Sequence, residues 1–196
     1  MIRRIGLGLA FLALAGCQSV PVRPVAAPAA AARDALTLLH AWHATGRVGV
    51  RTGNDGFQAS FDWREAAGRG ELAVRGPFGA GAARVIRTDA HIRIESGDAA
   101  PVEVDAPFDA LERTFTERIG FPLPLDSLRY WLLGVPAPGQ PSVGDGARFD
   151  QAGWGVAISE YAVVPGAPGP LPARLVLTRA STRIKVIVEH WQAGVP

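Results

Sequence analysis

The histidines, serines and single cysteine are the residues whose types could do chemistry, and only the cysteine stands in a known pattern. His40 and His43 are three residues apart, but no third metal ligand lies near them in the sequence. Ser60 and Ser127 have no motif around them, and the patterns G-x-S-x-G, H-E-x-x-H and a Gly-rich phosphate loop are all missing. The sequence therefore predicts a protein without a catalytic centre, a metal or a cofactor.

Cys17 lies at the end of a segment that predicts export from the cytoplasm. Arg3 and Arg4 precede an apolar stretch at residues 5–15. A membrane-spanning helix needs roughly 20 apolar residues, so this stretch is too short and is typical of a secretory signal. The letters LAGC at residues 14–17 resemble the bacterial lipobox, in which the signal is cut before the cysteine and that cysteine is acylated. Residues 1–16 are accordingly predicted to be a signal peptide.

Acylation of Cys17 would fix the protein to a membrane. Each buried methylene contributes about 0.8 kcal/mol, so several acyl chains together make a stable anchor. Residue 18 is Gln, whereas Asp commonly marks retention at the inner membrane in enteric bacteria. We therefore expect an anchor in the outer membrane, with the protein on its periplasmic face.

The composition of the mature chain argues against a nucleic-acid partner. The sequence has 20 basic and 18 acidic residues, and the predicted signal contains two arginines and no acid. The mature chain is therefore formally neutral and has no excess of positive charge for binding a polyanion. Residues 17–33 are rich in Pro and Ala and are predicted to be a lipidated, flexible tether. Residues 34–196 are long enough for one domain with a sizeable core.

Hydrophobic alternation predicts a domain that is mainly β. Phe57, Ala59, Phe61 and Trp63 alternate with polar residues, a period of two that is typical of a half-buried strand. The same period predicts strands at residues 57–63, 71–75, 91–95, 102–104, 154–158 and 184–188. Turn signals at residues 53–56 and 96–98 separate neighbouring strands, and Pro- and Gly-rich loops are expected at 135–147 and 164–172.

Three short helices are predicted beside the strands. The first begins at Asp34 and has its apolar face at residues 36, 39 and 42. The second begins at Pro107 and ends at Gly120, with an apolar stripe at residues 108, 111, 115 and 119. The third has its stripe at residues 125, 128, 131 and 132 and ends at Gly134. Because these stripes must be buried, we expect an open antiparallel half-barrel whose concave apolar face is covered by the helices.

Short motifs occur in a specific order along nearly the whole mature chain. They are the lipobox, Trp42 followed by TGRV at 45–48, FDW at 61–63, GPFG at 76–79, IGFPLP at 119–124, LRYWLLG at 128–134, QAGW at 151–154 with Tyr161, LPA at 171–173 and the segment 184–191. In the order and spacing of these motifs, the chain resembles the LolB family of outer-membrane lipoprotein receptors. The resemblance implies a half-barrel that takes lipoproteins from a LolA-type periplasmic carrier and places them in the outer membrane as a monomer. It implies that the apolar cavity holds the acyl chains of this cargo and that no cofactor is used.

The resemblance also implies roles for particular residues. Members of the family have a protruding loop with an exposed leucine that promotes membrane insertion, and Phe78 stands at the matching position in this chain. The apolar residues of the strands and helices are candidates for the cavity or its lid, although ordinary core packing would need the same residue types. These candidates are Phe61, Trp63, Leu72, Val74, Trp131, Leu132, Trp154 and Ile158.

Three other functions remain open at this point. A soluble LolA-like carrier would have the same fold but must diffuse, which acylation of Cys17 forbids. A structural envelope lipoprotein would bind a protein or cell-wall partner and would need no acyl cavity. An enzyme that acts on lipid or cell wall would need a catalytic constellation, and the sequence contains none.

Cys17→Ala should abolish acylation and leave an uncleaved or mislocalised precursor, since the thiol is the site of lipid attachment. Membrane fractionation and mass spectrometry of the purified protein measure this. Maturation and outer-membrane fractionation like those of the wild type would rule out the lipobox.

Overall fold

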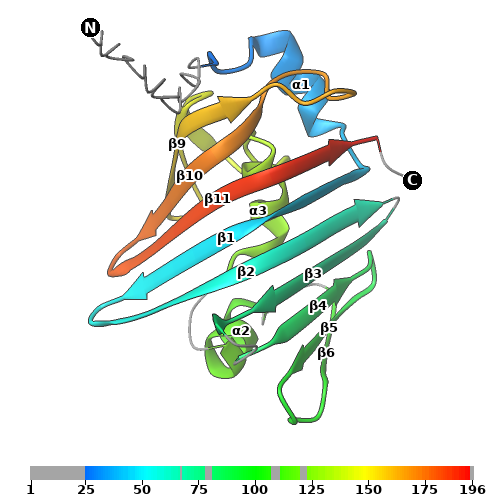
Figure 1. Cartoon of the computed structure of the whole chain (residues 1–196), viewed down its shortest axis with the longest axis vertical. Helices are drawn as coiled ribbons and strands as arrows, with labels where there is room; N and C mark the ends of the chain where they lie inside the picture. The colour runs from blue at the N-terminus through cyan, green and yellow to red at the C-terminus, as the bar shows by residue number, and fades with distance from the viewer. Residues whose placement is uncertain (1–24, 67, 78–80, 107–110, 120–122, 195–196) are drawn as a thin grey trace, which may run out of the picture.

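The computed structural model describes residues 25–66, 68–77, 81–106, 111–119 and 123–194. Their strands form one antiparallel sheet of eleven strands in the order β6-β5-β4-β3-β2-β1-β11-β10-β9-β8-β7 (Figure 1). The strands are β1 (Trp42–Thr52), β2 (Asp55–Ala66), β3 (Arg69–Arg75), β4 (Ala83–Arg87), β5 (His91–Ser96), β6 (Val102–Asp105), β7 (Ser142–Asp145), β8 (Arg148–Gln151), β9 (Trp154–Ala162), β10 (Leu171–Arg179) and β11 (Thr182–Ala193). The helices are α1 (Ala30–Thr37), α2 (Leu111–Ile119) and α3 (Leu125–Leu132).

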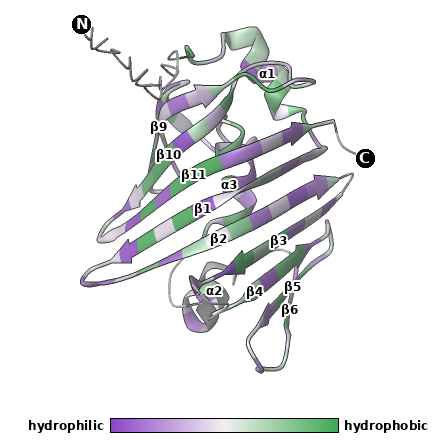
Figure 2. Ribbon diagram, in the orientation of Figure 1, coloured by the Kyte–Doolittle hydropathy of each residue, from purple (hydrophilic) through white to green (hydrophobic). Residues whose placement is uncertain are grey.

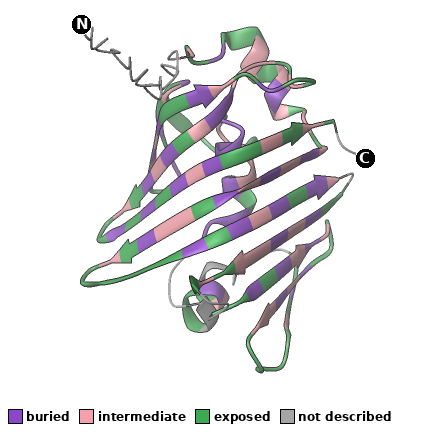
Figure 3. Cartoon of the chain, viewed as in Figure 1, coloured by how far each residue is buried: buried purple, intermediate pink, exposed green. Residues whose placement is uncertain are grey.

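One face of the sheet is apolar and lies on the side of the helices α2 and α3, and the other is polar and open to solvent. Buried and exposed residues alternate along the central strands, as Figure 3 shows, and apolar and polar residues alternate with them (Figure 2). The predicted fold class, a mainly β, open antiparallel half-barrel with a few short helices, is confirmed.

Gly46 lets the two central strands curve around the core. The register between β1 and β11 shifts at Thr45/Gly46, which is the pattern of a β-bulge. A Cβ atom at Gly46 would lie 2.0 Å from the carbonyl oxygen of Ile187 and 3.0 Å from the Phe61 ring, so no other residue fits. Bulges bend and twist the strands that contain them, and this one bends the middle of the sheet.

Helix α3 lies against the concave face of the sheet. Its residues Leu125, Leu128, Trp131 and Leu132 are buried, as their helical spacing predicted. The helix ends before Gly134, whose φ of +81° is favourable for glycine. Helix α2 lies on the same side of the sheet (Figure 1), and its Phe115 is fully buried.

Gln151 fixes α3 to the sheet. Its side-chain oxygen accepts hydrogen bonds from the indole Nε1 of Trp131 and from the backbone NH of Ala137, each at 2.8 Å. Its amide Nε2 donates to the backbone oxygens of Ala137 and Gln140 at 2.8 Å and 3.1 Å. This buried amide therefore holds both the helix and the loop that follows it against β8.

Several predicted elements differ from the structure. The first helix begins at Ala30 rather than Asp34, so residues 30–33, predicted to be in the tether, are helical. Trp42, predicted to be in that helix, begins β1, and His43 therefore lies on a strand beside Asp62, with 3.1 Å between Nε2 and Oδ1. Strands β1, β4, β7, β8 and β10 were not predicted. Pro107, the predicted start of the second helix, lies outside the described residues.

Within the described part of the chain, no helix is long and apolar enough to cross a membrane.

A buried ion pair lies where β2, β4 and α3 meet. Nη2 of Arg87 is 2.6 Å from Oε2 of Glu65, and the two side chains are 7% and 5% exposed. Nε1 of Trp63 donates to the other Glu65 oxygen at 2.9 Å. Partial burial raises the pKa of the nearby Asp126 carboxyl, and the positive charges of Arg87 and Arg129 oppose this shift. The pair is costly to break because either charge alone would be buried without a counter-ion.

Arg87→Leu should lower the free energy of unfolding by about 3–5 kcal/mol, because it leaves the Glu65 carboxylate buried and uncompensated. Adding Glu65→Gln should recover part of this loss, since the amide keeps an oxygen for Trp63 without the charge. The control is Arg47→Leu, which breaks a pair of the same 2.6 Å length whose side chains are 68% and 42% exposed. It should cost at most about 1 kcal/mol. Equal losses in the two single variants, measured by denaturant unfolding, would contradict the role of burial.

Candidate functional site

An apolar crevice lies between α3 and the strands β1, β2, β3 and β11. Its cavity volume is about 50 Å³, and it has no polar lining. It is lined by Val48, Phe57, Phe61, Trp63, Leu72, Val74, Leu123, Leu128, Leu132, Ile184 and Val186. A crevice of this size has room for only a few water molecules, so a larger ligand would have to separate α3 from the strands.

The crevice continues into a wider groove of about 540 Å³. Both are lined by Phe57, Leu72, Val74 and Leu123, which shows that they are parts of one concave surface. The groove extends past Phe115 of α2 to the loop at Gly76 and Pro77 and is mostly apolar. Its volume falls in the range of small-molecule sites, about 300–1,000 Å³.

The combined site is open at one end of β2 and closed at the other. Phe57, near the start of β2, is 37% exposed. The closed end contains the Trp63 ring, whose centroid is 5.5 Å from that of Trp42, and the Glu65–Arg87 pair lies beyond it. From Phe57 to Trp63 a strand advances about 20 Å, which is comparable with the length of an extended fatty acyl chain.

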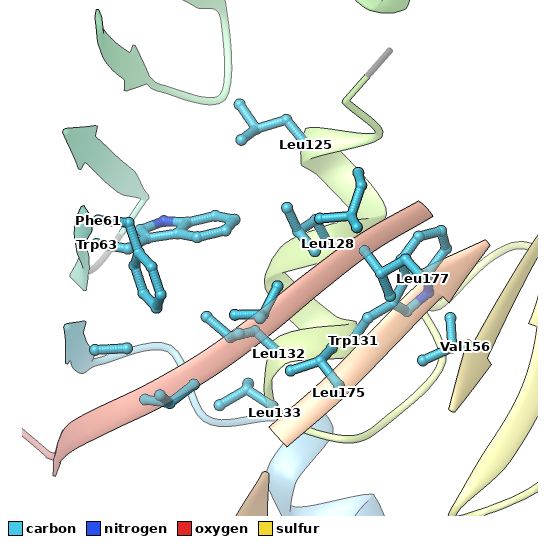
Figure 4. Packing of buried hydrophobic residues seen from close by; sticks show 14 of the residues in the cluster. Phe61, Trp63, Leu125, Leu128, Trp131, Leu132, Leu133, Val156, Leu175 and Leu177 are labelled. Atoms are coloured by element: carbon cyan, nitrogen blue, oxygen red, sulfur yellow. The ribbon is translucent and has the colours of Figure 1, made fainter. Parts of the chain in front are cut away.

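Helix α3 divides the eight predicted cavity residues into two groups. Phe61, Trp63, Leu72, Val74 and Leu132 line the crevice. Trp131, Trp154 and Ile158 line none of the described cavities. Figure 4 shows why: Leu128 and Leu132 face Phe61 and Trp63, whereas Trp131 faces Val156, Leu175 and Leu177 on the other side of the helix.

The second group forms a dense core with little room for a ligand. Trp131 and Trp154 are fully buried, their ring centroids are 6.4 Å apart, and Ile158 is buried as well. Binding of an acyl chain by any of the eight residues stays a prediction.

Several cavity residues were not predicted as such. They are Val48, Phe57, Phe115, Leu123, Leu128, Ile184 and Val186. The alternation of residues 57–63 already contained the signal for Phe57, since it shares a strand face with Phe61. Val48 lies beside Val186 because β1 pairs with β11. These two residues are 138 positions apart, so no local sequence pattern predicts that they are neighbours.

Cys17 and Phe78 lie outside the described residues. Pro77, which precedes Phe78, lines the wide groove, as does Gly81. The described residues on either side of Phe78 therefore both border the wide groove.

The described residues contain no group of three or more His, Cys, Asp or Glu side chains that could hold a metal ion. The phenol of Tyr161 donates to the backbone oxygen of Gly146 at 2.8 Å, and burial raises its pKa to about 12. It joins β9 to the turn between β7 and β8 and lines no cavity of the apolar site. The site thus offers mainly apolar surface to a ligand, with the polar side chains of Gln58 and Ser96 in the wide groove.

Comparison with known proteins identifies the family. Residues 40–191 match the family model described as outer membrane lipoprotein LolB. The chain belongs to the LolB family. The outer-membrane lipoprotein LolB of Alkalilimnicola ehrlichii is 33% identical over 94% of each chain, and that of Chromobacterium violaceum is 32% identical over 98% of this chain and all of the relative. Membership of this family indicates an outer-membrane lipoprotein.

A solved structure outside the LolB family shares the fold. The crystal structure of a DUF1329 family protein from Desulfovibrio piger aligns with a TM-score of 0.50 and covers 87% of this chain and 95% of that one. The identity between the two chains is 11%, so the likeness concerns the fold alone.

Val74→Asp should weaken binding of a fluorescent fatty-acyl probe roughly tenfold or more, because it puts a charge on the wall shared by the crevice and the groove. Val74 is half-buried, so the variant should still fold. Val143→Asp is the matched control, since Val143 is 74% exposed on β7. Unchanged probe affinity in a folded Val74→Asp protein would remove this wall from the binding site.

Proposed function

We propose that this chain is an outer-membrane-anchored receptor that accepts lipoproteins from a LolA-type carrier, holds their acyl chains in the apolar site and incorporates them into the outer membrane. The single observation that carries the proposal is the apolar crevice that is continuous with an open groove on the concave face. Family membership supports the same function.

The physical chemistry of the site matches an acyl chain better than a polar ligand. An acyl chain has no hydrogen-bonding groups, and the crevice lining has none to offer. Burial of apolar surface contributes about 0.8 kcal/mol per methylene, which readily supplies the roughly 8 kcal/mol that micromolar affinity requires, even after association costs. Because the empty crevice is small, entry of the chain opens α3 away from β2 and β3.

A structural envelope lipoprotein is the alternative. Such a protein would need a recognition surface for its partner and no room for a lipid. An open groove of about 540 Å³ lined mainly by apolar side chains favours the receptor, because exposed apolar surface is costly unless a ligand covers it.

Anchoring and release require two further parts of the chain. Acylated Cys17 would hold the protein at the outer membrane, and the Pro- and Ala-rich segment after it would let the domain reach both the carrier and the bilayer. Phe78 would insert its ring into the bilayer beside the mouth of the groove and contribute about 1.5–3 kcal/mol of apolar burial.

A two-step transfer assay tests the proposal. The wild-type protein should take an acylated lipoprotein from the carrier and pass it to liposomes. Phe78→Glu should still capture cargo, since the site on the concave face is intact, but should fail to deliver it because a charge replaces the inserted ring. Phe78→Leu should behave like the wild type, since leucine has the same apolar character.

The assay can also exclude the proposal. Folding of each variant is checked by thermal unfolding. A wild-type protein that captures no acylated cargo would contradict the receptor function. A Phe78→Glu protein that delivers normally would contradict the insertion role.

A further inference from the structure

Three unpaired cations gather at the end of the sheet where the cavity opens. Arg51 on β1 lies directly opposite Arg183 on β11, and Lys185 lies two residues farther along β11 on the same outer face. All three are exposed, and no ion pair or hydrogen bond joins their side chains to another described residue. Like charges directly opposite one another destabilise a sheet, so this pairing is not explained by stability.

The cations have no acidic neighbour across the strands. On β2, Gly56 lies opposite Arg51, and on β10 Thr178 lies opposite Arg183 and Val176 opposite Lys185. Three arginines elsewhere on the outer face differ, because each has an acidic partner: Arg47 with Glu189, Arg84 with Glu71, and Arg174 with Glu160. The mature chain has no excess charge, so this end of the sheet is a local concentration of positive charge.

The cations adjoin the mouth of the apolar site. A shallow groove of about 690 Å³ contains all three of them, and Phe57, Gln58 and Pro77 line both this groove and the wide apolar groove. The tips of the two hairpins β1–β2 and β10–β11 lie side by side (Figure 1), where the NH of Gly53 donates to the oxygen of Ser181 at 3.2 Å. Asp55 is the acidic residue that lines the shallow groove.

We propose that Arg51, Arg183 and Lys185 form a basic rim that binds the phosphates of anionic phospholipids and holds the mouth of the site against the bilayer. The inference rests on the proposed function and adds a lipid-headgroup contact to it. Cations beside exposed apolar side chains are the combination that binds membrane surfaces, with the rings entering the interface and the cations meeting the phosphates. The exposed Phe57 and the loop at Pro77 provide the apolar part beside the rim.

The test uses the full mature chain with Cys17→Ser, so that the acyl anchor does not mask the contact. Its sedimentation with vesicles is measured for neutral phosphatidylcholine and for mixtures with phosphatidylglycerol. We expect binding to anionic vesicles, with loss at high salt, because exposed charges are screened. The triple variant Arg51→Gln, Arg183→Gln, Lys185→Gln should bind anionic vesicles roughly 100-fold more weakly, at the usual contribution of each cation near a membrane surface.

The control variant is Arg47→Gln, Arg84→Gln, Arg174→Gln, which changes the net charge by the same amount but removes cations that are already paired. It should keep most of the binding to anionic vesicles. Equal losses in both triple variants, or undiminished binding in the rim variant, would overturn the proposal. If the rim variant binds vesicles normally but no longer accepts cargo from the carrier, the cations face the carrier protein, and the proposal is wrong.

Binding of the acyl probe in solution separates this inference from the proposed function. The rim lies outside the crevice, so the rim variant should bind the probe like the parent. If the parent does not bind the probe at all, the proposed function fails whatever the vesicles show. If probe binding is intact and the rim variant still binds vesicles, the rim proposal alone fails.

Discussion

The apolar face of the sheet is larger than its helices can cover, and the site is a consequence of this mismatch. Eleven strands side by side extend about 50 Å. Helix α3 has eight residues and is therefore about 12 Å long, with a diameter of about 10–12 Å. Even with α2 on the same side, the described residues leave part of the apolar face without a protein layer against it. In a soluble domain such uncovered apolar surface marks a binding site, and here it lies along β2 and β3.

The position of α3 decides which part of the concave face is core and which is cavity. On the β9–β10 side, Trp131 packs into the sheet and is fixed by its hydrogen bond to Gln151. On the β2–β3 side, Leu128 and Leu132 face Phe61 and Trp63 across a crevice with no polar contact in it (Figure 4). The helix is therefore held firmly along one edge and only by apolar contacts along the other. In the mechanism that we propose, this asymmetry would let an acyl chain enter on one side without loss of the fold.

The sequence predicted those strands and helices that have a clear hydrophobic pattern within their own residues. Alternation located β2, β9 and β11, and helical spacing located α3 together with its end at Gly134. Strand β1 was missed because Gly46 and Gly49 interrupt its alternation, and because Trp42 falls at helical spacing from Leu36. All four residues of β7 are exposed, so it has no apolar pattern to detect.

The sequence predicted the apolar character of the site but not which residues line it. Every residue proposed for the cavity is apolar and on a concave element, and none of the described ones is exposed. Which of them line the crevice depends on the direction in which α3 crosses the sheet, and that direction is set by contacts such as Trp131 with Gln151, far apart in sequence. The cluster of unpaired cations could not be predicted from the sequence either, because Arg51 and Arg183 become neighbours only through the pairing of β1 with β11.

Photo-crosslinking from inside the site would show whether the acyl chains of the cargo bind there. A photoreactive amino acid at Leu72, on the wall shared by the crevice and the groove, is irradiated after an acylated lipoprotein has been transferred from the carrier. We expect the crosslink to join Leu72 to the acyl chains of the cargo, and the same amino acid at the exposed Val143 to give none. Crosslinks from Val143 but none from Leu72, in a protein that has captured its cargo, would show that the acyl chains bind outside the crevice and the groove.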